Sequence, residues 1–186
     1  MAELSIAESK TLKWEGGYCN VAGDRGGETI FGIARNMHPK LSLWGIMDTY
    51  KRNYESFRKP HYKELEKLCL GNAEFKKEMH NFYRKEFWDK IKGDLIESQE
   101  VANALYDFAV NSGVSKAVKS IQEILGIAVD GNLGAKTIAA INSKYSKELC
   151  NKLCDKRAAF FEAIAKKGEN AKFLKGWLNR VKDFYV

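Results

Sequence analysis

Two acidic residues near the N-terminus, Glu15 and Asp24, have types and a spacing that suit acid–base chemistry. Eight residues separate them, and glycines follow each one closely. A helix expected over 3–14 would end beside Glu15, where the partial negative charge of a helix C-terminus disfavours an anion. Glycoside hydrolysis commonly uses two carboxyl groups, one that protonates the leaving oxygen and one that acts as base or nucleophile. The pair therefore predicts a glycosidase site.

Each carboxylate also has a plain structural explanation. Glu15 could be a solvent-exposed residue at a helix end, and Asp24 lies in a Gly-Asp-Arg-Gly sequence that favours a turn. Trp14 favours the chemical interpretation, because a general acid is best placed in apolar surroundings. If Asp24 points away from Glu15, Glu28 and Asp107 are the alternative second carboxylates.

The elements that must position these residues are predicted to be α-helices. The chain has two prolines in 186 residues, and it is rich in good helix formers, so little interrupts a helical period once it begins. Asn72 and Ser98 are expected to cap two of the helices. Helices are expected over 3–14, 43–57, 61–69, 73–92, 98–112, 115–125, 134–142, 146–167 and 170–184.

The segment 16–33 is the exception to this helical pattern. Six of the fifteen glycines fall within residues 16–32, and glycine marks turns and close backbone approach. We expect a small glycine-rich hairpin or loop lobe after the first helix. The hydrophobic fraction of 45% is enough to bury a core, which excludes disordered and low-complexity classes.

The glycine-rich segment also resembles a known family signature. The motif reads Glu15-Gly16-Gly17-Tyr18-x-Asn20-x3-Asp24-x-Gly26-Gly27-x-Thr29-x2-Gly32-Ile33. It is similar to the N-terminal signature of glycoside hydrolase family 108, bacterial and phage N-acetylmuramidases with a lysozyme-like fold. The Glu, eight residues, Asp spacing also resembles phage-type lysozymes, in which a threonine follows; Thr29 stands in the comparable place, one residue early.

Motifs further along the chain resemble the same family. Residues 82–89 are similar to the helix that closes the catalytic region, and residues 107–113 and 125–137 are similar to a module called a predicted peptidoglycan-binding domain. The resemblance implies an all-α, lysozyme-like fold. It places the catalytic region at 1–92 and a helical peptidoglycan-binding region at 93–186, packed together as one compact unit.

The resemblance also implies roles for individual residues. Glu15 would be the general acid, Asp24 the base that orients water or stabilises the oxocarbenium ion, and Thr29 a residue that positions water. Tyr18 and Asn20, from the same motif, would bind substrate. The reaction would be hydrolysis of the β-1,4 bond between N-acetylmuramic acid and N-acetylglucosamine, with no metal or cofactor.

A polar stripe on the helix expected over 98–112 offers further substrate contacts. Asn103, Asp107 and Asn111 recur every four residues, which places them on one helix face. The stripe could line a sugar groove or face water. Arg157 lies on the apolar face of another helix, where an unpaired charge is costly, so we expect it to pair with a buried carboxylate.

The charge distribution bears on possible partners. The formal net charge is +7, and residues 144–186 hold eleven Lys and Arg against five Asp and Glu. Such a basic region attracts polyanions, whether nucleic acid, anionic lipid or wall polymer. We expect peptidoglycan strands as the partner of a monomer. Two alternatives remain open: a non-catalytic wall-binding or secretion-accessory protein, and a nucleic-acid binder, which lacks a recognisable motif.

The cysteines and the N-terminal segment indicate where the protein is made and where it acts. Cys19, Cys69, Cys150 and Cys154 have no zinc-site spacing, so reduced thiols are expected. No stretch approaches the length of a membrane span. The N-terminus lacks the basic start and apolar stretch of a signal peptide. We therefore expect synthesis in the cytoplasm and action at the cell wall or periplasm after release by another route.

Overall fold

The computed structural model describes residues 1–21 and 23–186. The chain forms two compact units. One unit is continuous and comprises Leu12–Tyr83. The other combines Met1–Thr11 with Arg84–Val186, so it contains both ends of the chain. The expected boundary between residues 92 and 93 therefore falls inside this second unit.

The continuous unit holds a small sheet and three α-helices. The sheet is antiparallel with strand order β1-β2-β3. It was expected only as a hairpin or loop lobe, because strands of two residues leave no alternating pattern in the sequence. The elements are β1 (Tyr18–Cys19), β2 (Thr29–Ile30), β3 (Ile33–Ala34), α2 (Leu43–Lys51), η1 (Lys59–His61), α3 (Tyr62–Gly71) and α4 (Ala73–Tyr83).

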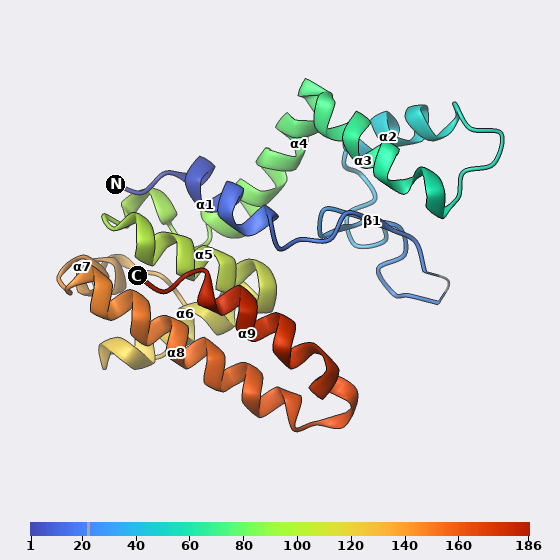
Figure 1. Ribbon diagram of the computed structural model, residues 1–186. Helices are drawn as coiled ribbons and strands as arrows, with labels where there is room; N and C mark the ends of the chain where they lie inside the picture. Colours follow the sequence, from blue (N-terminus) through green and yellow to red (C-terminus); the bar gives the residue numbers. More distant parts are fainter. Residues whose placement is uncertain (22) are drawn as a thin grey trace. The chain divides into compact units, whose positions relative to one another are not determined.

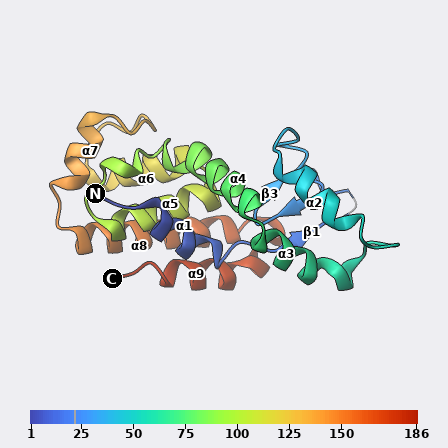
Figure 2. The ribbon, with the colours of Figure 1, turned by 90° about the horizontal axis from the view of Figure 1, so that it is seen from above.

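The two faces of this sheet have different environments. Tyr18 pairs with Ile30, which pairs with Ile33, and all three side chains are buried. On the other face, Thr29 pairs with both Cys19 and Ala34 and is partly exposed. Since cross-strand partners share a face, Thr29 belongs to the solvent face. β1 lies beside α3, as Figure 2 shows.

The three helices of this unit pack through apolar residues at helical spacing. α4 buries Phe75, Met79 and Phe82. Asn72 caps this helix as predicted, since its side-chain oxygen accepts a hydrogen bond from the Phe75 amide at 2.9 Å. α2 is shorter than expected and ends at Lys51.

The second unit is a helical bundle centred on α5. α5 packs against α6 and α8, and α8 lies side by side with α9 (Figure 1). Ser98 caps α5 as predicted by accepting a hydrogen bond from the Val101 amide at 3.2 Å. The elements are α1 (Leu4–Leu12), the π-helical turn η2 (Arg84–Trp88), η3 (Gly93–Leu95), α5 (Gln99–Ser112), α6 (Val114–Leu125), α7 (Ala135–Asn142), α8 (Ser146–Ala165), η4 (Gly168–Phe173) and α9 (Leu174–Lys182).

A buried ion cluster holds three helices of this bundle together. The carboxylate of Asp107 on α5 is fully buried and lies 2.6 Å from Arg157 of α8 and 2.7 Å from Arg180 of α9. The prediction that Arg157 pairs with a buried carboxylate is confirmed. Burial lowers the pKa of Arg157, and the attraction of Asp107 opposes that shift. Asp107 therefore belongs to the core, and its oxygens are not accessible to solvent or substrate.

The polar stripe on α5 needs the same correction. Asn103 is 7% exposed, and its side-chain oxygen accepts a hydrogen bond from Gln99 at 2.7 Å. Asn111 is half-buried and accepts a hydrogen bond from Arg157 at 3.4 Å. The stripe therefore presents no row of three free polar groups: Asp107 is bound by arginines of α8 and α9, Asn103 bonds within α5, and Asn111 contacts Arg157 and stays partly exposed.

The thiols and the helix lengths agree with the sequence. All four cysteines are free; Cys19 is exposed and the other three are buried. Burial raises the pKa of the Cys69 thiol to about 12. Within the described part of the chain, every helix is too short or too polar to cross a bilayer.

Candidate active site

Glu15 lies in the turn that follows α1. The helix ends at Leu12, earlier than expected, and the Glu15 amide donates a hydrogen bond to the Leu12 carbonyl at 3.3 Å. The carboxylate packs on Gly32: a Cβ at that glycine would lie 2.6 Å from Oε2 of Glu15 and 2.8 Å from the Tyr83 hydroxyl oxygen. Only a glycine leaves room for both groups at this position.

Gly32 is part of the tight turn between β2 and β3. Phe31 and Gly32 have φ values of +46° and +76°, the signature of a type I′ hairpin turn. A bulky residue is uncommon in this left-handed region. Phe31 is held there by two hydrogen bonds, from the Tyr83 hydroxyl to its carbonyl at 2.6 Å and from its amide to the Gly17 carbonyl at 3.3 Å.

Tyr83 is the residue of this site that sequence reasoning missed. Its side chain is 1% exposed and reaches from the last residue of α4 to the hairpin turn. The family-like motif over 82–89 contained Tyr83, but nothing in its spacing distinguished a tyrosine that supports Glu15 from a core residue. Its hydroxyl joins α4 to the Phe31 carbonyl and lies, like the Glu15 carboxylate, beside Gly32.

Asp24 and Thr29 are brought together around Gly26. A Cβ at Gly26 would lie 3.7 Å from both Oδ2 of Asp24 and Oγ1 of Thr29. Asp24 is exposed and accepts a hydrogen bond from the Gly26 amide at 3.3 Å, so it also shapes the turn. The Thr29 hydroxyl donates to the Gly27 carbonyl at 3.2 Å. Both interpretations of Asp24 are therefore compatible with its position.

Asn36, which sequence reasoning did not single out, holds this loop from the turn that follows β3. Its amide nitrogen donates to the Arg25 carbonyl at 3.2 Å, and its backbone N–H donates to the Gly26 carbonyl at 3.2 Å. The side chain also fills the space beside Gly27, which has a φ of +65°. The loop that carries Asp24 is thus tied to the hairpin.

Tyr18 and Asn20 have different environments. Tyr18 is 6% exposed, and its hydroxyl donates a hydrogen bond to Glu28 at 2.5 Å. Burial and the neighbouring Glu28 carboxylate raise the pKa of Tyr18 well above its usual value. Tyr18 therefore supports the sheet from its buried face, contrary to the substrate contact expected for it. Asn20 is exposed, and a hydrogen bond from its side chain to Tyr18 opposes the rise in the pKa of that tyrosine.

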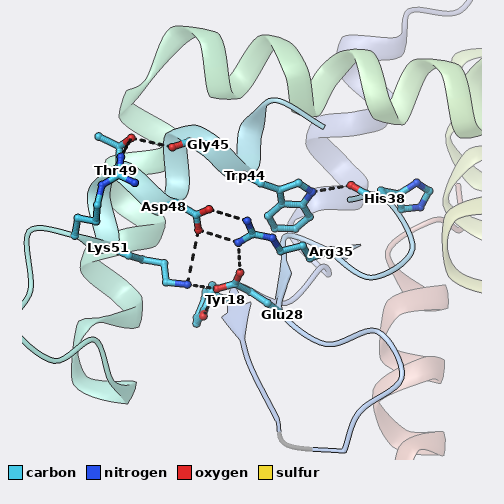
Figure 3. Close-up of polar contacts among 10 residues, drawn as sticks. Tyr18, Glu28, Arg35, His38, Trp44, Gly45, Asp48, Thr49 and Lys51 are labelled. Carbon is cyan, nitrogen blue, oxygen red and sulfur yellow. Dashed lines mark hydrogen bonds and ion pairs between the residues drawn. The ribbon is translucent and has the colours of Figure 1, made fainter. Parts of the chain in front are cut away.

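Glu28 anchors an ion network behind the hairpin (Figure 3). Its side chain is 9% exposed and pairs with Arg35 at 2.7 Å and with Lys51. Arg35 also binds Asp48 through two hydrogen bonds of 2.8 and 2.7 Å. Burial alone would raise the pKa of Glu28, but hydrogen bonds from Lys51, Tyr18 and Arg35 hold it below its usual value. Of the three carboxylates considered as partners of Glu15, Glu28 and Asp107 are held in ion pairs, and Asp24 is the exposed one.

The arrangement is that of a carboxylate in the turn after α1 that packs on the β2–β3 hairpin, with a second carboxylate and a hydroxyl close together in the segment that leads into and forms this hairpin. Among residues 1–21 and 23–186 there is no group of three or more His, Cys, Asp or Glu side chains that could hold a metal ion. The chemistry open to these residues is proton transfer and the positioning of water.

Comparisons with known proteins agree with this chemistry. A family model described as Glycosyl hydrolase 108 matches residues 9–113, and one described as Predicted Peptidoglycan domain matches residues 116–182. The structure is similar to one described as "Structure of Brucella abortus SagA", with 30% identity, a TM-score of 0.66, and coverage of 97% of this chain and 90% of that chain. No curated protein matches the chain.

The first of these matches covers more than half of the chain, and together the two models extend from residue 9 to residue 182. The mostly helical architecture with a small sheet confirms the predicted lysozyme-like fold. The resemblance seen in the glycine-rich motif is confirmed as well. The chain belongs to the glycosyl hydrolase 108 family and is a glycoside hydrolase that acts on peptidoglycan.

Proposed function

We propose that this protein is an N-acetylmuramidase that hydrolyses the β-1,4 bond between N-acetylmuramic acid and N-acetylglucosamine. The observation that carries the proposal is the position of Glu15. Its carboxylate packs on Gly32 beside the Tyr83 hydroxyl, at a hairpin turn that a hydrogen bond from Tyr83 stabilises. A general acid needs such a fixed position relative to the leaving oxygen. The site of action is then the bacterial cell wall.

The reaction follows from the residues of the hairpin unit. Glu15 donates its proton to the bridging oxygen as the bond from that oxygen to the anomeric carbon breaks. A water molecule adds to the anomeric carbon, and Asp24 accepts its proton or stabilises the positive charge on the sugar ring. The Thr29 hydroxyl, close to Asp24 around Gly26, positions this water. Exchange with solvent then restores both carboxyl groups.

The test is cleavage of purified peptidoglycan sacculi by the full chain and its Glu15→Gln variant. The amide keeps the size of the side chain but cannot donate an acidic proton, so activity should fall by about 10²- to 10⁴-fold. Glu55→Gln, a substitution of an exposed glutamate, is the matched control and should retain full activity. Retention of more than a third of wild-type activity in Glu15→Gln would refute the assignment.

The released fragments test the bond that is cut. Reduction with borohydride converts the free reducing end of each fragment to an alcohol, which mass spectrometry identifies. Reduced N-acetylmuramic acid ends are expected. Reduced N-acetylglucosamine ends would mean that the other glycosidic bond is cut, and ends that resist reduction would mean that the bond is broken without addition of water. If the wild-type chain binds sacculi but releases nothing, it is a wall-binding protein.

A further inference from the structure

Tyr145 is unusually exposed for an aromatic residue. It lies between α7 and α8, and its side chain is 70% exposed, against 49% for Phe173 and 40% for Tyr185. A tyrosine ring exposed to this degree gains little from the core. Large aromatic side chains in such positions commonly serve recognition, since they offer an apolar face and a polar hydroxyl together.

Two surface hollows meet at this residue. One, of about 160 Å³, is also lined by Leu125, Glu148 and Lys152, and the other, of about 380 Å³, by Glu97, Ser98 and Val101. Lys144 and Tyr145 line both hollows. A ligand longer than one hollow can therefore cross the ridge that these two residues form.

The rim of the larger hollow is fixed by Asn142, the last residue of α7. Its amide nitrogen donates to the Leu95 carbonyl at 2.9 Å, and its side-chain oxygen accepts from the Glu97 amide at 3.0 Å. These two bonds join residues far apart in the sequence and hold α7 against the segment before α5. The hollow is consequently preformed, which reduces the ordering cost of binding.

The charge of the ridge favours an anionic ligand. Lys152 pairs with Glu148 at 2.6 Å, so the charges of these two residues offset each other. For Lys144, the described residues provide no ion-pair partner, and Lys147 beside it is likewise exposed and without one. Lys144 interacts electrostatically with Glu148, and Glu97 lines the larger hollow, so the positive charge around the ridge is partly offset. The ammonium groups of Lys144 and Lys147 still lie outside any ion pair of the described residues and can pair with a carboxylate of a ligand.

We propose that this ridge, formed by Lys144 and Tyr145, is a binding site for the peptidoglycan strand, separate from the residues that cut it. The apolar face of a sugar ring stacks on Tyr145, and a carboxylate of the acidic stem peptide pairs with Lys144. The inference rests on peptidoglycan being the substrate, and it deepens that assignment by naming where the helical unit binds the strand.

Co-sedimentation of the full chain with purified sacculi, on ice and over a short time, tests this site. Tyr145→Ala should weaken binding by about fivefold or more, in the range of a central aromatic contact. Tyr145→Phe should bind nearly as wild type, because it keeps the ring. Phe173→Ala removes an exposed aromatic residue elsewhere in the same unit and is the control, expected to change binding by less than about twofold.

The charge component has its own matched pair. Lys144→Gln with Lys147→Gln should weaken binding to intact sacculi, but not to glycan from which an amidase has removed the stem peptides. Lys166→Gln with Lys167→Gln, an equal loss of charge at exposed lysines, should have a smaller effect. An equal effect of both pairs would show that only the net charge of the chain matters and would overturn the role of Lys144.

Binding and cleavage separate this proposal from the proposed function. If Tyr145→Ala binds sacculi as tightly as wild type does, the ridge is not a binding site, while muramidase activity can stand. Weaker binding with an unchanged rate on a short soluble oligosaccharide supports the ridge. A wild-type chain that neither binds nor cleaves sacculi would overturn both.

Discussion

The Gly32→Ala substitution tests most directly whether catalysis depends on the position of the Glu15 carboxylate against Gly32. An alanine Cβ would lie 2.6 Å from Oε2 of Glu15 and 2.8 Å from the Tyr83 hydroxyl oxygen. Real Cβ contacts are essentially never shorter than 3.0 Å, so the carboxylate must move by about 0.4 Å or more. A misplacement of about 1 Å can cost about 10² in rate. We expect activity on sacculi to fall by about 10- to 100-fold.

Backbone strain must be separated from this displacement. Gly32 has a φ of +76°, and a non-glycine residue in the left-handed region costs about 1–2 kcal/mol. Gly126→Ala is the matched control, because Gly126 has a φ of +67° and no heavy atom within 4 Å of its Cβ position. For a chain of this length each kcal/mol lowers the melting temperature by about 2–4 °C.

The assay is the initial rate of turbidity loss of a sacculi suspension, at a temperature where circular dichroism shows both variants folded. Both should melt a few degrees below wild type, and only Gly32→Ala should lose activity. If Gly32→Ala keeps more than a third of wild-type activity and has the same melting temperature as Gly126→Ala, the argument that Gly32 positions the Glu15 carboxylate is refuted.

Three further predictions concern single carboxylates. Asp24→Asn can keep the turn hydrogen bond to Gly26 while losing its charge, so sacculi cleavage should fall by about tenfold or more at an unchanged melting temperature; an active variant removes Asp24 from the mechanism. Asp107→Asn leaves two arginines buried with a neutral partner and should lower the free energy of unfolding by about 3–5 kcal/mol. As a control, Glu123→Gln breaks a surface ion pair with Lys156 at 2.7 Å and should lower it by no more than about 1 kcal/mol. Equal urea midpoints of the two variants would contradict this. The pKa of Glu28 is lowered in the folded state, so the stability that its ionised carboxylate contributes is present above the unfolded pKa of about 4.5 and is lost as the pH falls through the folded value. In Glu28→Gln, the loss of stability between pH 7 and pH 3 should therefore be smaller than in wild type. An unchanged loss would show that the ion network of Glu28 does not stabilise the fold.

The helical part of this fold was predictable because local signals suffice there. Asn72 and Ser98 mark two helix starts through a hydrogen bond three residues away, and few prolines interrupt the period. The charge pairing of Arg157 was also predictable, because a guanidinium on an apolar helix face requires a partner. These inferences need only short stretches of sequence or one strong energetic constraint.

The environment of individual site residues was not predictable in the same way. Tyr18 and Asp107 were expected to meet substrate, yet each is buried by partners distant in the sequence: Glu28 for Tyr18, and Arg157 and Arg180 for Asp107. A polar residue at regular spacing has the same pattern whether solvent or an arginine faces it. Tyr83 was missed for the complementary reason, since an aromatic residue on a helix resembles core until its hydroxyl is seen to reach Phe31.

The discontinuous helical unit has a consequence for how the chain is made. Its N-terminal part depends on later sequence: the Ala2 amide bonds to the Ile96 carbonyl at 2.8 Å, and the Lys10 ammonium lies 4.8 Å from the centre of the Phe184 ring. During synthesis these contacts of the N-terminal segment form only after Ile96 and Phe184 have been made, whereas every residue of the continuous unit from Leu12 to Tyr83 has been made by then. The unit that contains the hairpin is thus an insertion between the two parts of the helical unit, and its replacement by the corresponding segment of another protein requires only two chain junctions.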